Sequence, residues 1–574
     1  MVQVICATSH VEISPLTTVH TTGIRTDFKP AIFIPHSLSI HHYKLLLLSS
    51  MTITTKMEPS FQGNQFFPGT AAYKRANNIY ATSTYGVSRD MNPSEILQPA
   101  SIEDIQEVVK AATKMGKPLA IRSGGHQYSG ASSTGSQGIQ LDLKPTFRRP
   151  NIDLNILREN GKVYLRSSVS WQLTEIFDFL KDNGVFMPTG QCSTVCLGGH
   201  VQTGGYGMLA RSFGLLGDWV RELEIIGYNG DVVKVTKDSH PDLFYGFLGG
   251  SPGNLGVLTH FKIEVQDDKN HQGSKGLWVG FAYKEETLKA LLDILVQKGE
   301  DPKLPRGYDF TVNIVSRQAN LLDLFPGSED ELKQKLPDDV HDGKDNIADL
   351  LKFKYAMIIV YAQWVNLNEE PYSPDLFTQI KNVPNEFKIV KEAPEGTPMS
   401  VIASMWLFGS PREFPYPYDK RTNSTTSTEL SKTGWSSWFS GRINEVIKDK
   451  HNGLWVSSQL QVYGGEQSMF RRNAGNGTAY CFRDATFGGT WDVFYQGTKE
   501  AAEKWQAVND EGRAKYFSKA DRRVLWGSYG DWNMKDVWQF YYDPETYKKM
   551  QKIRQTYDPK GTFTANPFCV EALK

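Results

Sequence analysis

The sequence has no excess of charge of either sign, since 63 lysines and arginines balance 63 aspartates and glutamates in 574 residues. A chain without net positive charge has no general attraction for nucleic acid or for an anionic membrane surface. It also contains no apolar run near the roughly 20 residues that cross a bilayer. We therefore expect neither a nucleic-acid partner nor a membrane span.

Cysteine is scarce and scattered. The five cysteines are Cys6, Cys192, Cys196, Cys481 and Cys569. They are too few for the disulfide framework of a small secreted domain. The first 15 residues lack a basic start followed by an apolar run, so they do not resemble a secretory signal. We expect an intracellular, cytoplasmic protein, in which the N-x-[ST] sequons at Asn423 and Asn476 are chance matches.

Regular patterns of secondary structure begin near residue 92. Ser101 is a suitable helix N-cap, apolar residues follow at helical spacing, and Gly116 ends the pattern. The strand-like stretch PLAI comes next and leads directly into a glycine-rich loop. Further strand and helix patterns follow, including a hairpin with its tight turn at Asn229-Gly230. These patterns predict an α+β domain over residues 92–268.

The rest of the chain divides less clearly. Residues 1–57 show no apolar period, and we interpret them as a disordered or wrongly assigned extension. The polar stretch DDKNHQGSK at 267–275 predicts a boundary, and strand and helix patterns mix beyond it in a second domain, 269–520. An acidic insert at 328–349 is expected to be a solvated surface excursion. A charged amphipathic helix and a turn are predicted near the C-terminus.

The loop IRSGGHQYSG combines features of two kinds of site. Gly124 and Gly125 would let backbone N–H groups approach a phosphate, and Arg122 would add positive charge. However, the loop contains neither G-x-x-x-x-G-K-[ST] nor G-x-G-x-x-G, which argues against a nucleotide triphosphatase. The alternative is that His126 is present for its own chemistry.

A second cluster, PTGQCSTVCLGGHVQTGGYG, is rich in glycine and contains Cys192, Cys196 and His200. A metal site is one interpretation, but the four-residue spacing differs from C-x₂-C zinc motifs. A cysteine–histidine nucleophile pair is another, although no third residue that would orient the histidine is evident. We expect no metal.

Both clusters resemble the covalent flavoprotein oxidases of the vanillyl-alcohol oxidase / p-cresol methylhydroxylase (PCMH) superfamily, in the berberine bridge enzyme-like branch. The first matches R-S-G-G-H-x-Y-x-G-x-S at 122–132, and the second matches G-x-C-x-x-V-x-x-G-G-H-x-x-x-G-G-x-G at 190–207. The segment HPDLFYGFLGGSPGNLGVLT at 240–259 is similar to a family segment that ends in G-N-x-G. The resemblance extends in consistent order over about residues 90–574.

The resemblance implies a two-lobed α+β fold. A PCMH-type FAD-binding domain would occupy 92–268, with a C-terminal segment, 521–574, packed back on it. A substrate domain at 269–520 would form an antiparallel sheet covered by helices. FAD would be held by two bonds, from a ring nitrogen of His126 to the flavin 8α-methyl and from the Cys192 sulfur to flavin C6. The other residues implied to bind FAD are Arg122, Ser123, Gly124, Gly125, Gln127, Tyr128, Gly130, Ser132, Gly190, Val195, Gly198, Gly199, His200, Gly204, Gly205, Gly207 and Val257.

Several positions depart from the family pattern. Cys196 stands where the family usually has glycine, so it could compete with Cys192 for the flavin. Leu248 replaces a usual arginine and Cys481-Phe482 replace a usual Pro-His, which weakens any transfer of substrate contacts. Val195, three residues after Cys192, is a residue that accompanies reaction with O₂ in this family and therefore favours an oxidase.

The implied reaction is hydride transfer from a substrate C–H bond to flavin N5, assisted by a base that removes an O–H, N–H or phenolic proton. Tyr529 lies in a segment similar to the family's N-Y-x-D and is our first candidate for this base or for a positioning phenol. Asp492 and Tyr463 lie on strands expected to floor the substrate pocket and are further candidates. Each tyrosine can equally be a packing residue.

We expect an FAD-dependent oxidase that takes a small hydrophobic molecule of secondary metabolism and returns electrons to O₂. Three alternatives keep the same cofactor. The site could close a ring oxidatively, it could oxidise a carbohydrate, or the protein could be a flavin-binding scaffold that steers cyclisation without net redox. Peroxide release in proportion to product would separate an oxidase from a scaffold.

Overall fold

The computed structural model describes residues 61–85, 88–250, 252–316, 356–407, 417–449, 453–497, 499–517, 520–524 and 529–573. All of them belong to one compact unit, Met57–Lys574. The predictions for 1–57 and for the acidic insert 328–349 lie outside the described residues. Within the described ranges, no helix combines the length and apolar character that a membrane span requires.

A four-stranded sheet carries the first glycine motif. Its strands in spatial order are β1 (Asn64–Phe66), β2 (Glu95–Gln98), β4 (Ile139–Asp142) and β3 (Leu119–Arg122). Helix α4 (Ile102–Met115) begins after Ser101, whose hydroxyl accepts a hydrogen bond of 3.2 Å from the Asp104 N–H. Gly116 ends the helix with φ +65°, a conformation that favours glycine. The predicted helix and the PLAI strand are both confirmed.

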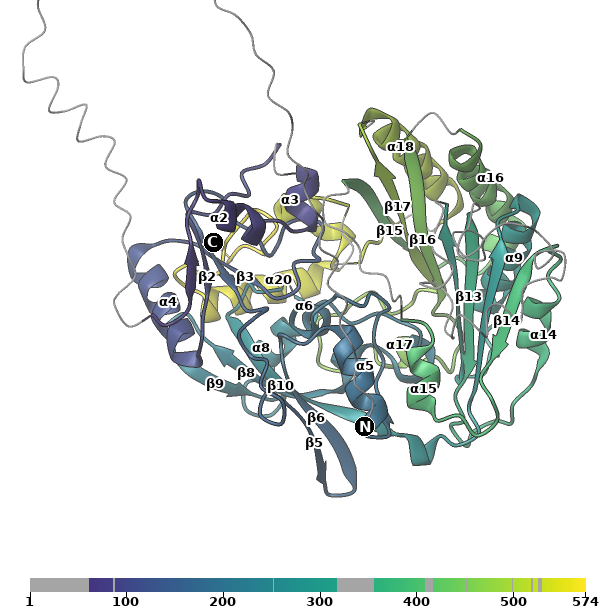
Figure 1. Ribbon diagram of the computed structural model, residues 1–574, viewed down its shortest axis with the longest axis horizontal. Coiled ribbons are helices and arrows are strands. Elements are labelled where there is room, and N and C mark those ends of the chain that lie inside the picture. The colour runs from purple at the N-terminus through teal and green to yellow at the C-terminus, as the bar shows by residue number, and fades with distance from the viewer. Residues whose placement is uncertain are drawn as a thin grey trace, which may run out of the picture. The chain divides into compact units, whose positions relative to one another are not determined.

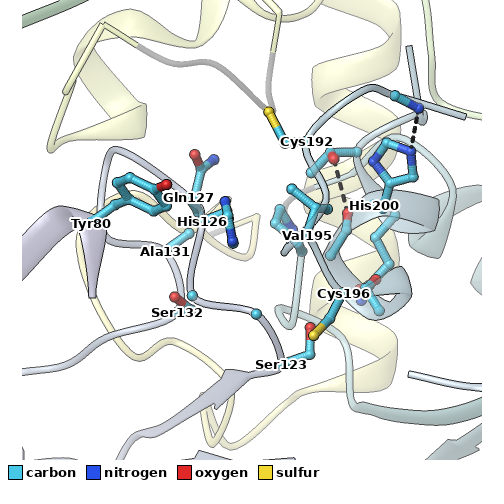
Figure 2. Close-up of a pocket in the computed structure, with 18 of the residues that line it drawn as sticks. Tyr80, Ser123, His126, Gln127, Ala131, Ser132, Cys192, Val195, Cys196 and His200 are labelled. Atoms are coloured by element: carbon cyan, nitrogen blue, oxygen red, sulfur yellow. Dashed lines mark hydrogen bonds between the residues drawn. The ribbon is translucent and has the colours of Figure 1, made fainter. Parts of the chain in front are cut away.

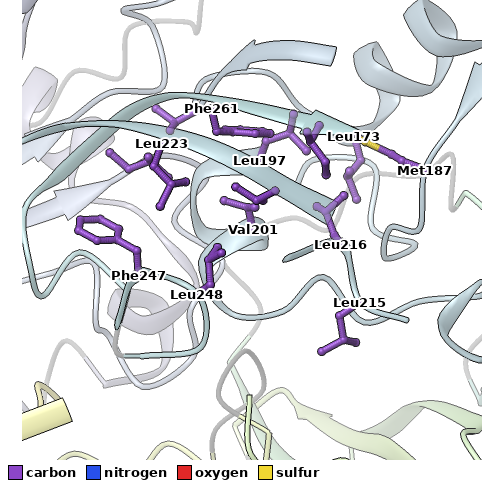
Figure 3. Packing of buried hydrophobic residues seen from close by; sticks show 14 of the residues in the cluster. Leu173, Met187, Leu197, Val201, Leu215, Leu216, Leu223, Phe247, Leu248 and Phe261 are labelled. Carbon is purple, nitrogen blue, oxygen red and sulfur yellow. The ribbon is translucent and has the colours of Figure 1, made fainter. Parts of the chain in front are cut away.

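A second, antiparallel sheet lies behind the second glycine motif. Its strands in spatial order are β5 (Leu154–Glu159), β6 (Lys162–Ser168), β10 (Val257–Asp267), β8 (Val220–Ile226) and β9 (Val232–Val235), with β7 (Val185–Phe186) paired to β10. The predicted hairpin is confirmed, because β8 and β9 pair antiparallel on either side of Asn229-Gly230. Figure 3 shows Leu197 and Val201 in the same buried cluster as Leu223 and Phe261 of this sheet. This packing anchors the segment that bears the second motif.

The third sheet is antiparallel throughout. Its strands in spatial order are β14 (Lys388–Glu392), β11 (Lys275–Ala282), β13 (Met357–Trp364), β12 (Tyr308–Val315), β16 (Leu454–Val462), β17 (Phe487–Tyr495) and β15 (Tyr418–Thr425). Helices α9 (Glu285–Glu300), α14 (Asp375–Lys381), α16 (Trp435–Lys448) and α18 (Lys499–Tyr516) accompany it (Figure 1). Ile358 and Val360 of β13 pack in the cluster under these helices, whereas Ile359 and Tyr361 belong to the cluster on the other face. Both faces of the strand are therefore buried.

The remaining elements are short, apart from α5 and α20. They are α2 (Ala71–Ala76), α3 (Tyr80–Tyr85), α5 (Leu173–Asp182), α6 (Leu197–Gln202), α7 (Ala210–Phe213), η1 (Leu216–Trp219), α8 (Pro241–Phe247), η2 (Asp268–Asn270), α15 (Met399–Ser404), η3 (Leu430–Lys432), α17 (Met469–Arg472), α19 (Met534–Val537), η5 (Trp538–Phe540) and α20 (Pro544–Tyr557). Elements before residue 92 were not expected from the sequence. One of them, α3, supplies Tyr80 to the candidate functional site.

Two polar contacts join distant parts of the chain near the site. The buried Arg211 on α7 donates its backbone N–H to Asp309 of β12 at 2.8 Å, and its guanidinium binds main-chain carbonyls around that strand. The side-chain amide of Asn566 donates to the carbonyls of Gly130, Ala131 and Ser133. The C-terminal segment thus contacts the continuation of the first glycine loop. The α+β fold with a separate antiparallel sheet is confirmed, while the domain limits stay predictions.

Candidate functional site

The two glycine motifs and the third sheet enclose one cavity, with about 1280 Å³ of empty space that is partly open to solvent. The sequence-predicted residues that line it are Ser123, Gly124, Gly125, His126, Gln127, Ser132, Gly190, Cys192, Val195, Gly198, Gly199 and His200. Tyr418, Lys420 and Gln459 line it from β15 and β16. We call this space the first cavity. Its walls therefore come from segments more than 300 residues apart in the sequence.

Two glycines let the loop after β3 lie close to the segment before α6. A Cβ atom on Gly124 would be 2.8 Å from the backbone nitrogen of Cys196, which is closer than real Cβ contacts. Gly125 has φ +68°, in the left-handed region that glycine adopts without strain. The loop thus keeps its main chain exposed to the cavity, as the approach of a phosphate or a planar ring requires.

His126 is fixed on the cavity wall by two neighbours. Its Nε2 lies 3.2 Å from the Thr194 hydroxyl, and its ring lies 4.7 Å from that of Tyr80, measured between centroids. Thr194 comes from the second motif and Tyr80 from α3, so three separate segments meet at this imidazole. Neither neighbour was identified from the sequence, because Thr194 is a variable position inside the motif and Tyr80 precedes the region with clear patterns.

The two cysteines of the second motif differ in environment. Cys196 is buried, its thiol donates to the Ser170 carbonyl at 3.6 Å, and burial raises its pKa to about 12. Both cysteines line the first cavity, but Cys192 is partly exposed. Their sulfurs point in different directions (Figure 2). Since a thiolate is the reactive form, the geometry favours Cys192 over Cys196 as the nucleophile.

His200 supports the segment that carries Cys192. Its Nε2 accepts a hydrogen bond of 2.9 Å from the Gly190 N–H, drawn as a dashed line in Figure 2. Burial lowers the pKa of this imidazole to about 4, so it is neutral near pH 7, with its proton on Nδ1. A ring nitrogen occupied by a backbone N–H cannot bind a metal, and the structure therefore gives His200 a positioning role.

Two buried polar side chains of the first cavity have no hydrogen-bond partner among the described residues. They are the hydroxyl of Ser132 and both amide atoms of Gln191. Buried polar groups are normally paired, so such atoms indicate a ligand that offers both donors and acceptors. FAD offers phosphate oxygens, ribityl hydroxyls and the polar edge of its pyrimidine ring. The cavity therefore fits FAD in its polar groups as well as in its glycine backbone.

The remaining predicted cofactor residues do not line the first cavity. They are Arg122, Tyr128, Gly130, Gly204, Gly205, Gly207 and Val257. Arg122 forms a buried ion pair of 2.8 Å with Asp142, and the Tyr128 hydroxyl donates to the carbonyl of Tyr418. These two side chains therefore hold neighbouring segments of the cavity wall together and do not face the cavity. Gly204 and Gly205 adopt positive φ angles in the turn before Tyr206.

The charged group that the third sheet presents to the first cavity is Lys420, which was not predicted from the sequence. Lys420 on β15 is held by Asp492 on β17, with its Nζ 2.7 and 2.8 Å from the two carboxylate oxygens. Asp492 is buried and does not line the cavity. The structure thus gives Asp492 the role of anchoring the ammonium and makes it a poor candidate for a free base.

The two tyrosines proposed from the sequence occupy different positions. Tyr463 is buried just after β16 and stacks on Phe470, with ring centroids 4.6 Å apart, beside a second cavity described below. Tyr529 donates its hydroxyl to the side-chain oxygen of Asn423 and lies between the guanidinium groups of Arg421 and Arg523. Burial raises the pKa of Tyr529 well above its ordinary value. Tyr529 lines neither cavity.

Comparisons with known proteins agree with this geometry. Residues 93–236 match the family described as an FAD binding domain. An FAD-linked oxidoreductase of Metarhizium anisopliae is 23% identical over 505 residues, which cover 86% of each chain. Berberine bridge enzyme-like 12 of Arabidopsis thaliana is 32% identical over 209 residues, 35% of this chain and 36% of that protein.

A solved structure of glucooligosaccharide oxidase from Acremonium strictum shares the fold. It has a TM-score of 0.62 at 14% identity and covers 89% of this chain and 97% of its own. That protein is described as carrying a 6-S-cysteinyl, 8α-N1-histidyl FAD. In the present chain, the matched FAD binding domain contains both glycine motifs and most of the first cavity wall. The chain is therefore an FAD-linked oxidoreductase with an FAD binding domain at residues 93–236, and it is similar to berberine bridge enzyme-like proteins.

Proposed function

We propose that this chain is an oxidase that carries FAD bonded to both His126 and Cys192, oxidises a small hydrophobic molecule and returns electrons to O₂. The observation that carries the proposal is the arrangement of the three possible nucleophiles. His126, Cys192 and Cys196 all line the first cavity, but the thiol of Cys196 is buried and donates a hydrogen bond to the Ser170 carbonyl. The doubly linked FAD described for glucooligosaccharide oxidase supports the same pair of residue types.

The contact between His126 and Thr194 prepares the imidazole for attack. A tautomer with its proton on Nε2 donates that proton to the Thr194 hydroxyl, 3.2 Å away. Nδ1 then keeps its lone pair and is the nucleophilic nitrogen. The Tyr80 ring restricts rotation of the imidazole from the opposite segment. Both neighbours therefore act on attachment of the cofactor, before any substrate is present.

Once bound, FAD supplies the hydride acceptor for a substrate C–H bond. The chain contributes a cavity wall and one fixed charge. The Lys420 ammonium, held by Asp492, can donate a hydrogen bond to a substrate oxygen and stabilise negative charge that develops there as a proton leaves. Gln459 lines the same side of the cavity and adds an amide to it.

The decisive experiment is to denature and acid-precipitate the purified protein and to map flavin on its peptides by mass. Wild type is expected to give a yellow pellet and two flavin-bearing sites. His126→Ala and Cys192→Ala should each keep one attachment, and the double variant should release all flavin. Cys196→Ala is the matched control and should keep both. Complete release of flavin from wild type would overturn the covalent proposal.

The choice of electron acceptor has its own test. An oxidase releases hydrogen peroxide in proportion to product, and its flavin is bleached by substrate only when air is excluded. Val195 in the second motif supports O₂ as the acceptor, as in the family it resembles. Product formed without peroxide and without bleaching would instead identify a scaffold that cyclises its ligand. Turnover of oligosaccharides in preference to aromatic alcohols would identify a carbohydrate oxidase.

A further inference from the structure

A second cavity adjoins the first at Thr203 and Tyr206, which line both. It has about 630 Å³ of empty space, again partly open to solvent, and lies between α6, the end of β16 and the C-terminal segment. None of the groups assigned to cofactor attachment lines it. A ligand could therefore occupy this space while FAD occupies the first cavity.

Seven aromatic rings line the second cavity. They belong to Tyr206, Tyr463, Phe470, Tyr480, Phe482, Tyr541 and Tyr542. Tyr463 stacks on Phe470 at 4.6 Å and meets Tyr206 edge-on at 6.1 Å, so these rings hold one another in place. Flat ring faces in fixed positions favour a flat, apolar ligand, which gains from both burial and ring packing.

The charges around the second cavity argue against an ionic ligand. No acidic residue is found among the described residues that line it, so a protonated amine would have no counter-charge. Its lining cation, Arg523, is already bound to Asp521 at 2.8 Å and to Asp531 at 2.7 Å. A ligand carboxylate would have to compete with both of these carboxylates. A neutral ligand neither needs a counter-charge nor competes for Arg523.

Two buried donors in the wall have no partner among the described residues. The side-chain nitrogen of Asn423 has no partner among the described residues, and Asn423 is only 2% exposed. Its orientation is set by Tyr529, whose hydroxyl donates to the amide oxygen and leaves the NH₂ group on the other side. The hydroxyl of Tyr542, another wall residue, is also unpartnered within the described ranges. A buried amide donor of this kind is satisfied by an acceptor oxygen on a ligand.

We propose that the second cavity binds the ring system of the substrate, and that this substrate is a neutral aromatic or polycyclic molecule with an acceptor oxygen that binds Asn423 Nδ2. The proposal rests on the proposed function, because it places the ring system next to the cavity assigned to FAD. It makes Asn423 a specificity-determining residue, with Tyr529 as the residue that positions it. An oligosaccharide fits poorly, since Asn423 and Tyr542 are the wall residues, among those described, whose buried polar atoms lack a partner, and they would satisfy few of its hydroxyls.

The test compares two ligands of nearly equal shape on the FAD-loaded enzyme, using isothermal titration calorimetry. The probes are 2-acetylnaphthalene, which has an acceptor oxygen, and 2-ethylnaphthalene, which has none. Wild type is expected to bind the acetyl compound at least tenfold more tightly, and to bind cellobiose more weakly than either. Equal affinity for the two naphthalenes, or tighter binding of cellobiose, would overturn the proposal.

Two variants test which residues cause the preference for the acetyl compound. Asn423→Asp keeps an oxygen for the Tyr529 hydroxyl but replaces the free donor with an acceptor, so the tenfold preference should disappear. Tyr542→Phe should weaken binding of the acetyl compound by no more than about threefold while the ethyl compound binds unchanged. An undiminished preference in Asn423→Asp would refute the role of this amide. Retention of flavin on His126 and Cys192, measured on the same samples, shows independently whether the covalent proposal stands.

Discussion

The walls of the two cavities in this molecule differ in amino-acid composition. The wall of the first includes glycines at 124, 125, 190, 198 and 199, where the main chain faces the cavity between side chains such as those of Lys420 and Gln459. The second is lined by seven aromatic side chains. A backbone wall suits a ligand that is the same in every member of a family, since its polar groups have fixed positions. A side-chain wall suits a ligand that differs between relatives, because each ring can change without disturbing the fold.

The difference between the cavities also predicts different effects of mutation. Changes in the first cavity should alter flavin content, whereas changes in the third sheet and the second cavity should alter stability or substrate choice and leave the flavin bound. A variant of one kind should therefore change one of these two properties and leave the other unchanged.

The largest effect is expected at the Lys420–Asp492 pair. Both side chains are buried, so Asp492→Leu leaves an ammonium without its counter-charge. Breaking such a pair costs about 3–5 kcal/mol. Urea unfolding should show a loss of this size. Any protein that still folds should carry its full complement of covalent flavin, because Asp492 lies outside the first cavity.

The double variant Lys420→Met/Asp492→Leu is the control for this prediction. It removes both charges and should recover most of the lost stability, since replacing a buried pair by apolar side chains is often neutral. Substrate turnover should stay low in the double variant, because the cavity has lost its ammonium. Full activity in that variant would remove Lys420 from the proposed chemistry.

The second effect concerns Gly124. Its Cβ in Gly124→Ala would lie 2.8 Å from the Cys196 nitrogen, so the loop after β3 must shift away from the second motif. We expect FAD incorporation to fall at least tenfold, measured as flavin absorbance per mole of protein. Gly441→Ala on helix α16 is the matched control. Its Cβ would lie 3.6 Å from the Glu285 side chain, which is an ordinary van der Waals distance. Normal flavin content in Gly124→Ala would mean that FAD binding does not require the close approach of the two motifs at Gly124.

The sequence correctly predicted those elements whose structure is determined by neighbouring residues in the chain. Ser101, Gly116 and the strand before the glycine loop form a contiguous pattern, and the structure reproduces it. It failed where a side chain is placed by distant packing. Lys420 lies in YDKRTNST, a stretch of β15 without the alternation of apolar and polar residues that would predict a strand. Only the pairing of β15 with β17 brings this lysine to Asp492.

The third effect concerns Thr194 and is confined to one of the two attachments. Thr194→Val keeps the shape but removes the hydroxyl that meets His126 Nε2 at 3.2 Å. The imidazole tautomer is then less defined, and we expect about threefold less flavin attached through His126 after a fixed incubation of apoprotein with FAD. Attachment through Cys192 should be unaffected. Thr194→Ser should behave as wild type, and a loss in that variant too would point to packing instead of hydrogen bonding.

The fourth effect is a pH dependence centred on His200. Its pKa is about 4 in the folded protein and about 6.5 when unfolded, so the unfolded chain binds more protons between these values. Stability from this group is therefore complete above pH 6.5 and is lost as the pH falls towards 4. We expect about 1 kcal/mol less stability at pH 5.5 than at pH 7 from this group. His200→Gln keeps an acceptor for the Gly190 N–H and cannot titrate, so its urea midpoint should change less between the two pH values. An equal loss in both proteins would assign the pH dependence to other groups and leave His200 with its hydrogen bond alone.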